Sequence, residues 1–122
     1  MKSILLLGGG GRIGSAIALK LYKDFHITLV DLKQPEDCVF DLIGSDVQFI
    51  KMDIENHERL FYLTQDYDLI VNALPSYYYN YVLDLAVGCR KPIYITAQGK
   101  EYNLINNSNN YMEFFCQMEG KE

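Results

Sequence analysis

The stretch from Ile4 to Gly14, ILLLGGGGRIG, joins a short apolar run to a loop made almost entirely of glycine. A continuous apolar run closed by glycine is typical of a strand buried on both faces, as in a parallel sheet. After the glycines, apolar residues recur every fourth position at Ile13, Ile17 and Leu21. This period predicts an amphipathic helix from about Arg12 to Lys23. The stretch therefore predicts a strand, a glycine turn and a helix in direct succession.

The four consecutive glycines fit a Gly-x-Gly-x-x-Gly phosphate loop in one register only. A start at Gly8 fails because Ile13 occupies the sixth position, whereas a start at Gly9 fits. In such a loop the first glycine allows the turn, the second a close approach of the ligand, and the third tight packing of helix on strand. The unpaired N–H groups and partial positive charge of the helix N-terminus favour a pyrophosphate. The predicted binding residues of the loop are Gly9, Gly10, Gly11, Arg12, Ile13 and Gly14, with Gly8 and Gly10 as accessories to the three working glycines.

Four more apolar strands follow the first, and helical stretches separate them. The predicted strands are His26–Asp31, Val47–Ile50, Asp68–Ala73 and Pro92–Thr96, and the predicted helices are Gln34–Ser45, Glu55–Thr64 and Tyr77–Val87. This alternation indicates βαβ units with right-handed crossovers. The predicted fold class is α/β: a Rossmann-like, doubly wound parallel sheet of strand order 3-2-1-4-5, in a single three-layer domain.

The pattern changes after Gln98. Residues 103–110 contain five asparagines, and no further strand is predicted. We therefore expect a dinucleotide-binding domain over residues 1–100. Residues 101–122 are expected to form a polar, Asn-rich tail that can end in a helix over Tyr111–Met118, where a second catalytic lobe would otherwise begin.

An acidic residue at the end of the second strand bears on the choice of cofactor. Asp31 lies 17 residues after Gly14, close to the spacing of about 20 at which an acid binds the adenosine ribose hydroxyls. The carboxylate would repel a ribose phosphate, so NAD is the predicted cofactor. Lys33 and Arg12 keep NADP open, because either long cationic side chain could bind that phosphate.

The composition excludes several other functions. The net charge of −5 argues against a nucleic-acid or anionic-membrane surface, which would need a basic face. The three cysteines, Cys38, Cys89 and Cys116, are too scattered for a disulfide framework or a metal site, and no metal is predicted. No segment predicts a signal peptide or a membrane span, so we expect a cytoplasmic protein.

Taken together, these segments resemble the N-terminal NAD(P)-binding domain of the saccharopine dehydrogenase family. The resemblance covers roughly residues 3–97, and it rests on the glycine loop, Val30–Asp31, Lys51–Ile54, Asp68–Pro75 and Pro92–Thr96. The family has a similar Gly-x-Gly-Arg-hydrophobic-Gly loop, although such loops are common among dehydrogenases. The Asn-Ala-Leu-Pro segment that ends at Pro75 is more specific.

The resemblance implies roles for residues beyond the loop. Asp53 and Ile54 would lie beside the adenine, with the Asp53 carboxylate accepting from its amino group. Ala73, Leu74 and Pro75 would line the cleft where the strand order reverses. The family reaction is hydride transfer between a nicotinamide cofactor and amino-acid substrates, which interconverts an amine and an imine or carbonyl compound. The chain would be the cofactor-binding part of such an NAD(P)-dependent dehydrogenase acting on CH-NH donors.

The family's substrate site belongs largely to a second domain, which this sequence lacks. We therefore assign no catalytic residue, and we expect a second lobe, a partner subunit or a homodimer to complete the site. His26 and His57 are expected away from the cleft. The segment Tyr77–Tyr81, YYYNY, departs from a typical member, and either core packing or an exposed aromatic patch can explain it.

Two other functions share part of this sequence pattern. A non-enzymatic nucleotide sensor, such as the NAD-binding regulatory domain of a potassium transport system, shares the glycine loop and the strand-end acid. A short-chain or sugar-nucleotide enzyme would need a Tyr-x-x-x-Lys pair, and no tyrosine of the chain has a lysine four residues later. The sensor therefore remains the alternative to the dehydrogenase domain.

Overall fold

The computed structural model describes residues 2–33, 41, 43, 46–89, 93–97 and 101–105. Six strands form one sheet in the order β3-β2-β1-β4-β5-β6. The strands are β1 (Ser3–Leu7), β2 (His26–Asp31), β3 (Val47–Lys51), β4 (Leu69–Asn72), β5 (Ile93–Ala97) and β6 (Glu101–Ile105). The first five pair in parallel, which confirms the predicted strand order 3-2-1-4-5.

The last strand corrects the sequence prediction. β6 (Glu101–Ile105) pairs antiparallel with β5 (Ile93–Ala97), so the expectation of no strand after Gln98 is wrong. The segment EYNLI contains Glu and Asn, which are poor strand formers, and its extended backbone is supported by pairing with β5. The sheet continues past residue 100, where the polar tail was expected to begin. The rest of that tail, with the helix predicted over Tyr111–Met118, lies outside the described residues.

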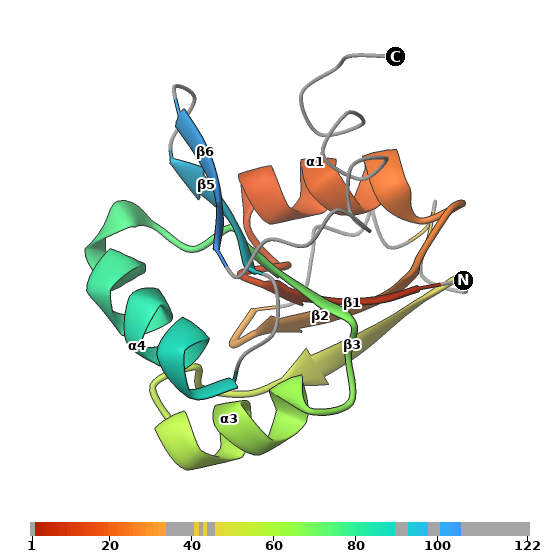
Figure 1. Cartoon of the computed structure of the whole chain (residues 1–122). Coiled ribbons are helices and arrows are strands. Elements are labelled where there is room, and N and C mark those ends of the chain that lie inside the picture. Colours follow the sequence, from red (N-terminus) through yellow and green to blue (C-terminus); the bar gives the residue numbers. More distant parts are fainter. Residues whose placement is uncertain are drawn as a thin grey trace.

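Three helices of the described residues cover the two faces of the sheet (Figure 1). These are α1 (Arg12–Leu21), α3 (His57–Thr64) and α4 (Tyr79–Cys89), and the 3₁₀ turn η1 (Ser76–Tyr78) leads into α4. Both ends of each helix fall within two residues of the predicted ones. The helix predicted over Gln34–Ser45 lies outside the described residues, apart from Asp41 and Ile43.

The alternation of side chains along β1 produces two separate cores. Ile4 and Leu6 pack with α1 residues such as Ile17 and Leu21 on one face. Leu5 and Leu7 point to the other face and pack with residues of α3 and α4. Because successive strand residues point to opposite faces, an uninterrupted apolar run is what a strand between two helical layers requires. The predicted three-layer arrangement is confirmed.

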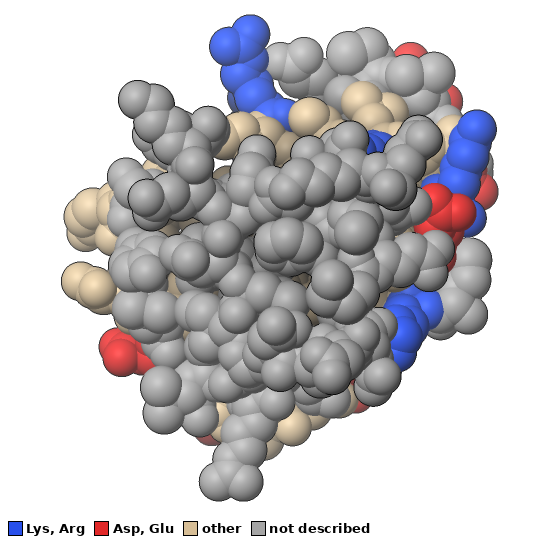
Figure 2. All heavy atoms as spheres, turned by 45° about the horizontal axis from the view of Figure 1, so that its top comes forward, with Lys and Arg blue, Asp and Glu red and all other residues tan. Residues whose placement is uncertain are grey.

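The described part of the chain has no helix that is both long and apolar enough to cross a bilayer. Lys and Arg side chains on the face seen in Figure 2 stand apart from one another among the described residues, with acidic side chains between some of them. This part of the surface therefore presents separated charges instead of one basic patch.

Candidate functional site

The strand order reverses at β1, which lies between β2 and β4. The predicted binding residues follow the carboxyl ends of four strands: the glycine loop follows β1, Asp31 ends β2, Asp53 follows β3, and Ala73 follows β4. Carboxyl ends of parallel strands meet at the same edge of a sheet, and the crevice at the reversal is where such folds bind ligands. The topology therefore gathers residues that are far apart in sequence at one place.

The turn after β1 is made by Gly8. Gly8 is the glycine with a positive φ, of 81°, among the described residues, a backbone conformation that other residues adopt only with strain. Its N–H donates to the carbonyl of Val30 at 2.9 Å, which joins the turn to β2. The prediction that Gly8 is an accessory is therefore wrong, whereas Gly9 does lie inside the turn, which the N–H of Gly11 closes on the Gly8 carbonyl at 3.1 Å. The sequence pattern could not separate the two, because adjacent glycines satisfy the same motif.

The next glycines differ in the space around them. A Cβ at Gly14 would lie 2.2 Å from the carbonyl oxygen of Gly8, and a Cβ at Gly10 would lie 1.6 Å from the carbonyl oxygen of Lys33. Both positions are closed to any side chain, so Gly10 is more than an accessory. A Cβ at Gly11 would meet only the carbonyl oxygen of Gly8, at an ordinary 3.5 Å. Gly11 therefore lies open on the side of the loop that faces the cleft.

Gly11 is also the N-cap of α1. It offers no side-chain cap, and the first turn of the helix contains no acidic residue. The N–H of Ser15 donates to the carbonyl of Gly11 at 2.9 Å and closes that turn. The N–H groups that precede Ser15 have no acceptor within the helix, as at every helix start. This helix start therefore offers donors and a partial positive charge to an anion, and no side chain caps it.

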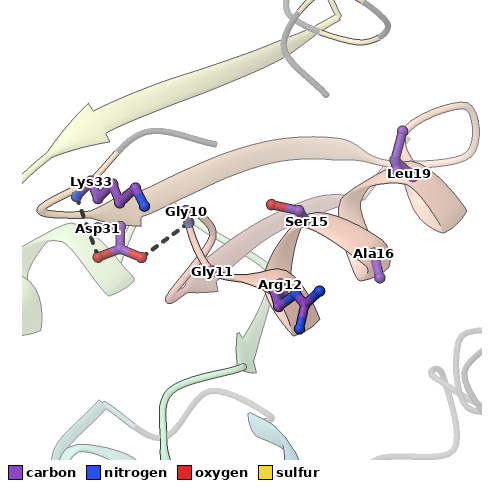
Figure 3. A pocket seen from close by; sticks show the side chains of 8 residues that line it. All are labelled: Gly10, Gly11, Arg12, Ser15, Ala16, Leu19, Asp31 and Lys33. Atoms are coloured by element: carbon purple, nitrogen blue, oxygen red, sulfur yellow. Dashed lines mark hydrogen bonds between the residues drawn. The ribbon is translucent and has the colours of Figure 1, made fainter. Parts of the chain in front are cut away.

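The Asp31 carboxylate braces the loop from the end of β2. Its Oδ2 accepts from the N–H of Gly10 at 3.0 Å, and its Oδ1 accepts from Leu32 at 2.7 Å and from Lys33 at 3.5 Å (Figure 3). Two carboxylate oxygens together accept about four hydrogen bonds, so acceptor capacity remains for a ligand. Asp31 therefore holds the glycine loop in place as well as facing the cleft.

A cleft of about 620 Å³ lies at the strand reversal, within the range of about 300–1,000 Å³ typical of small-molecule sites. Nine predicted binding residues line it: Gly11, Arg12, Ile13, Asp31, Asp53, Ile54, Ala73, Leu74 and Pro75. Gly9 and Gly14 are buried beneath the loop and do not line it. The structure thus brings together the side chains that the sequence placed on four separate loops.

A second hollow of about 470 Å³ adjoins the cleft at the glycine loop and lies against α1. It is lined by Gly10, Gly11, Arg12, Ser15, Ala16, Leu19, Asp31 and Lys33 (Figure 3). Gly11, Arg12 and Asp31 belong to both hollows. Lys33, which the sequence offered as a phosphate ligand, lines only this second one.

The loop after β3 forms one wall of the cleft. The Asp53 side chain accepts from the N–H of Glu55 at 2.9 Å, and the Asp53 carbonyl accepts from Asn56 at 3.0 Å. Ile54 is buried, and its carbonyl accepts a hydrogen bond from the hydroxyl of Tyr81. The exposed Asp53 carboxylate and the apolar Ile54 thus face the cleft from one tight turn.

The turn after β4 forms the opposite wall. Asn72 is buried, and its side-chain oxygen accepts from the N–H of Leu74 at 3.1 Å. The Pro75 carbonyl accepts from the N–H of Tyr78 at 2.9 Å, which begins the turn into α4. Asn72 therefore acts below the cleft surface, and it fixes the course of Ala73, Leu74 and Pro75.

Sequence reasoning missed four lining residues of the cleft, Gly8, Leu32, Glu55 and Tyr78. Burial raises the pKa of the half-buried Tyr78 phenol, and the carboxylate of Glu55 is the next largest cause. Tyr78 lies in the tyrosine segment that was open to two explanations. Only its position three residues after Pro75 could have placed it at the cleft.

The two histidines do not line the cleft, as expected. His26 begins β2 at the opposite edge of the sheet. His57 packs its ring against Tyr81, with ring centroids 4.0 Å apart. Among the described residues, no group of three His, Cys, Asp or Glu side chains could hold a metal ion.

The family model described as "Saccharopine dehydrogenase NADP binding domain" matches residues 4–112. A comparison with curated proteins finds no relative. Among solved structures, the chain is similar to saccharopine dehydrogenase (L-Glu forming) from Saccharomyces cerevisiae, with a TM-score of 0.66 and 18% identity over 80% of this chain and 22% of that one.

Two further similar structures contain a nicotinamide dinucleotide. One is a short-chain dehydrogenase/reductase from Veillonella parvula in complex with NADP, with a TM-score of 0.58 and 17% identity over 77% of this chain and 45% of that one. The other is the enzyme WbmG from Bordetella bronchiseptica in complex with NAD, with a TM-score of 0.51 and 18% identity over 62% and 26%. At these identities the likeness shows the fold, and the chain spans less than half the length of each.

Proposed function

Because the chain belongs to the saccharopine dehydrogenase NADP-binding domain family, we propose that it binds a nicotinamide dinucleotide in the cleft at the strand reversal. The observation that carries the proposal is the combination of an open Gly11 with the uncapped start of α1. A pyrophosphate needs both a close approach to the backbone and unpaired N–H donors. A side chain at Gly11 would occupy the space by which a pyrophosphate reaches the N–H groups of α1. The glycine at this position therefore suits that ligand.

The other lining residues fit the adenosine half of the same ligand. The remaining acceptor capacity of Asp31 suits the ribose hydroxyls, and the exposed Asp53 carboxylate suits the amino group of adenine. Ile54 and Leu74 offer apolar contact from the two walls. The proposed ligand residues are those predicted from the sequence, except that Gly9, Gly10 and Gly14 do not line the cleft and contribute through the close packing of the loop backbone.

The cofactor would supply hydride transfer, and the protein would supply binding and orientation. We propose an oxidoreductase in which an amine and an imine of amino-acid substrates are interconverted. The described residues that line the cleft include no histidine, cysteine or lysine, and we assign none of them to proton transfer. A second lobe or partner subunit would therefore contribute the substrate side, and we expect the 122-residue chain alone to bind the cofactor without turnover.

The charges around the cleft favour NAD over NADP. Asp31, Asp53 and Glu55 line it together with one cationic side chain, Arg12. Carboxylates at the ribose position disfavour an additional phosphate. Arg12 and Lys33 in the neighbouring hollow offer the opposite preference, because two cationic side chains there could hold a 2′-phosphate.

Calorimetric titration of the purified chain with NAD, NADP and ADP-ribose tests the proposal. We expect NAD and ADP-ribose to bind with similar affinity, and NADP to bind more weakly. Tighter binding of NADP would reverse the cofactor preference and leave the site intact. The absence of binding by all three ligands would contradict the proposed function.

A further inference from the structure

We propose that Tyr78 forms the aromatic wall of the cleft against which the adenine ring of the dinucleotide packs, and that Tyr81 positions this wall. The inference rests on the proposed function and extends it to a segment that the sequence left unexplained. Tyr78 ends η1 (Ser76–Tyr78), directly after the turn that contains Leu74 and Pro75. It lines the same cleft as Ile54 and Asp53, which follow β3 on the opposite wall.

The ring of Tyr78 packs against two neighbouring tyrosine rings. Tyr77 packs edge to face against it, with centroids 5.0 Å apart and an interplanar angle of 87°. Tyr81 packs against it in the same manner, with centroids 6.4 Å apart. Edge-to-face pairs of this kind lie in the favourable range of aromatic geometry. The orientation of the Tyr78 ring is therefore set before any ligand binds.

Tyr81 links this ring to the opposite wall of the cleft. Its hydroxyl donates to the carbonyl of Ile54, and its ring packs against His57 at the start of α3. Both Tyr78 and Tyr81 also pack against the core group that contains Ile54, Leu74 and Val82. A change at Tyr81 would therefore alter the distance between the Tyr78 ring and Ile54, although Tyr81 itself does not line the cleft.

The surrounding charges assign the ring to the adenine half of the ligand. The carboxylates of Asp31, Asp53 and Glu55 line the same cleft as the Tyr78 ring. Asp31 marks the ribose of the adenosine in folds of this kind. A ring that shares the cleft lining with Asp31 and Asp53 suits the adenosine side of the pyrophosphate. Stacking of a base on an aromatic side chain does not depend on a hydrogen-bonding pattern, so a phenylalanine should serve equally well.

The test compares binding of NAD, ADP and nicotinamide mononucleotide by the full chain and its variants. We expect Tyr78→Ala to weaken NAD and ADP by about tenfold each, which is within the usual effect of removing a stacked ring. Tyr78→Phe should retain the affinity within about twofold, since the ring remains. Tyr62→Ala provides the matched control, because Tyr62 is exposed on α3 and does not line the cleft.

If Tyr78→Ala does not fold by circular dichroism, Tyr78→Leu keeps the apolar bulk and removes only the flat ring, and it should lose about fivefold. Unchanged ADP affinity in a folded Tyr78→Ala or Tyr78→Leu variant would overturn the inference. Weaker NAD with unchanged ADP would also overturn it, because the ring would then contact the nicotinamide half. A wild-type chain that binds neither NAD nor ADP would defeat the proposed function itself, and with it this inference.

The positioning role of Tyr81 has its own readout. Tyr81→Phe keeps the ring packing against Tyr78 and removes the hydrogen bond to the Ile54 carbonyl. We expect an ADP affinity about threefold weaker, with unchanged binding of nicotinamide mononucleotide. A variant with wild-type ADP affinity would limit Tyr81 to a structural role.

Discussion

The glycine loop, Gly8–Ser15, and the aromatic turn, Ala73–Tyr81, both contribute residues to one cleft but are built in opposite ways. In the glycine loop the backbone itself is the binding surface, and it is fixed by contacts that leave no room for a Cβ at Gly10 or Gly14. In the aromatic turn, side chains form the surface, and ring packing and the Asn72 side chain fix it. A backbone surface has a narrow sequence signature, whereas a side-chain surface can be built from many residues.

The largest expected effect is a loss of stability on substitution of Gly14. Gly14→Val would place a Cβ 2.2 Å from the carbonyl oxygen of Gly8, so β1 and α1 could not keep their separation. Overpacking of this kind costs about 3 kcal/mol or more, and the thermal midpoint should fall by about 10 °C or more. Calorimetry or circular dichroism measures it. A wild-type midpoint would show that the loop is not as tightly packed as the structure indicates.

Gly11→Val separates binding from folding in the same loop. Gly11 has an extended backbone, and a Cβ there meets an ordinary contact of 3.5 Å, so the thermal midpoint should stay near that of the wild type. The valine would occupy the approach to the N–H groups of α1. Loss of about two charge-assisted hydrogen bonds weakens dinucleotide binding by about 100-fold. A folded variant with unchanged affinity would place the pyrophosphate elsewhere.

A substitution at Asp31 tests whether its carboxylate holds the glycine loop against β2. Asp31→Ala removes the acceptor of the Gly10, Leu32 and Lys33 N–H groups. We expect a loss of about 1 kcal/mol in stability and about tenfold in NAD affinity. NADP should lose less than NAD, because the repulsive carboxylate is gone. An equal loss for both cofactors would show that Asp31 acts only as a brace.

The smallest expected effect is a change in how stability depends on pH, and it involves Tyr81 of the aromatic turn. Burial raises the pKa of Tyr81 above its usual 10.0, and Asp53 and Glu55 add to the shift. The unfolded chain therefore ionises this phenol first as the pH rises. Its contribution to stability is complete below pH 10 and is lost as the pH rises through the raised pKa. Between pH 8 and pH 10.5, the free energy of unfolding should fall less for Tyr81→Phe than for the wild type, as measured by chemical denaturation. Identical losses would exclude Tyr81 as a source of the pH dependence.

The two regions also explain how much the sequence could predict. The five parallel strands and their order followed from apolar runs that alternate with helical periods, as in β1 and α1. Part of the cleft followed from the glycine loop after β1 and from Asp31 at the end of β2. The places of Asp53 and Pro75 followed from the family resemblance. The sequence could not show that Gly8 makes the turn, since this depends on φ.

Two other features depended on contacts across the chain. β6 has weak intrinsic strand preference, and its antiparallel pairing with β5 stabilises the extended backbone. The place of Tyr78 depends on the turn between Pro75 and α4. The segment 77–81 contains four tyrosines, and the sequence alone could not show which of them lines the cleft. In both cases a tertiary contact outweighed the local signal.

The central claim is that the start of α1 receives the pyrophosphate of a dinucleotide. Amide chemical shifts of the ¹⁵N-labelled chain, recorded during titration with ADP-ribose, test it most directly. We predict that the largest changes occur at Gly11, Arg12 and Ile13, with smaller ones at Asp31 and Ile54, and that all follow one binding curve. The largest changes at Ser3, His26 and Asp46, which line a hollow at the opposite edge of the sheet, would contradict the account.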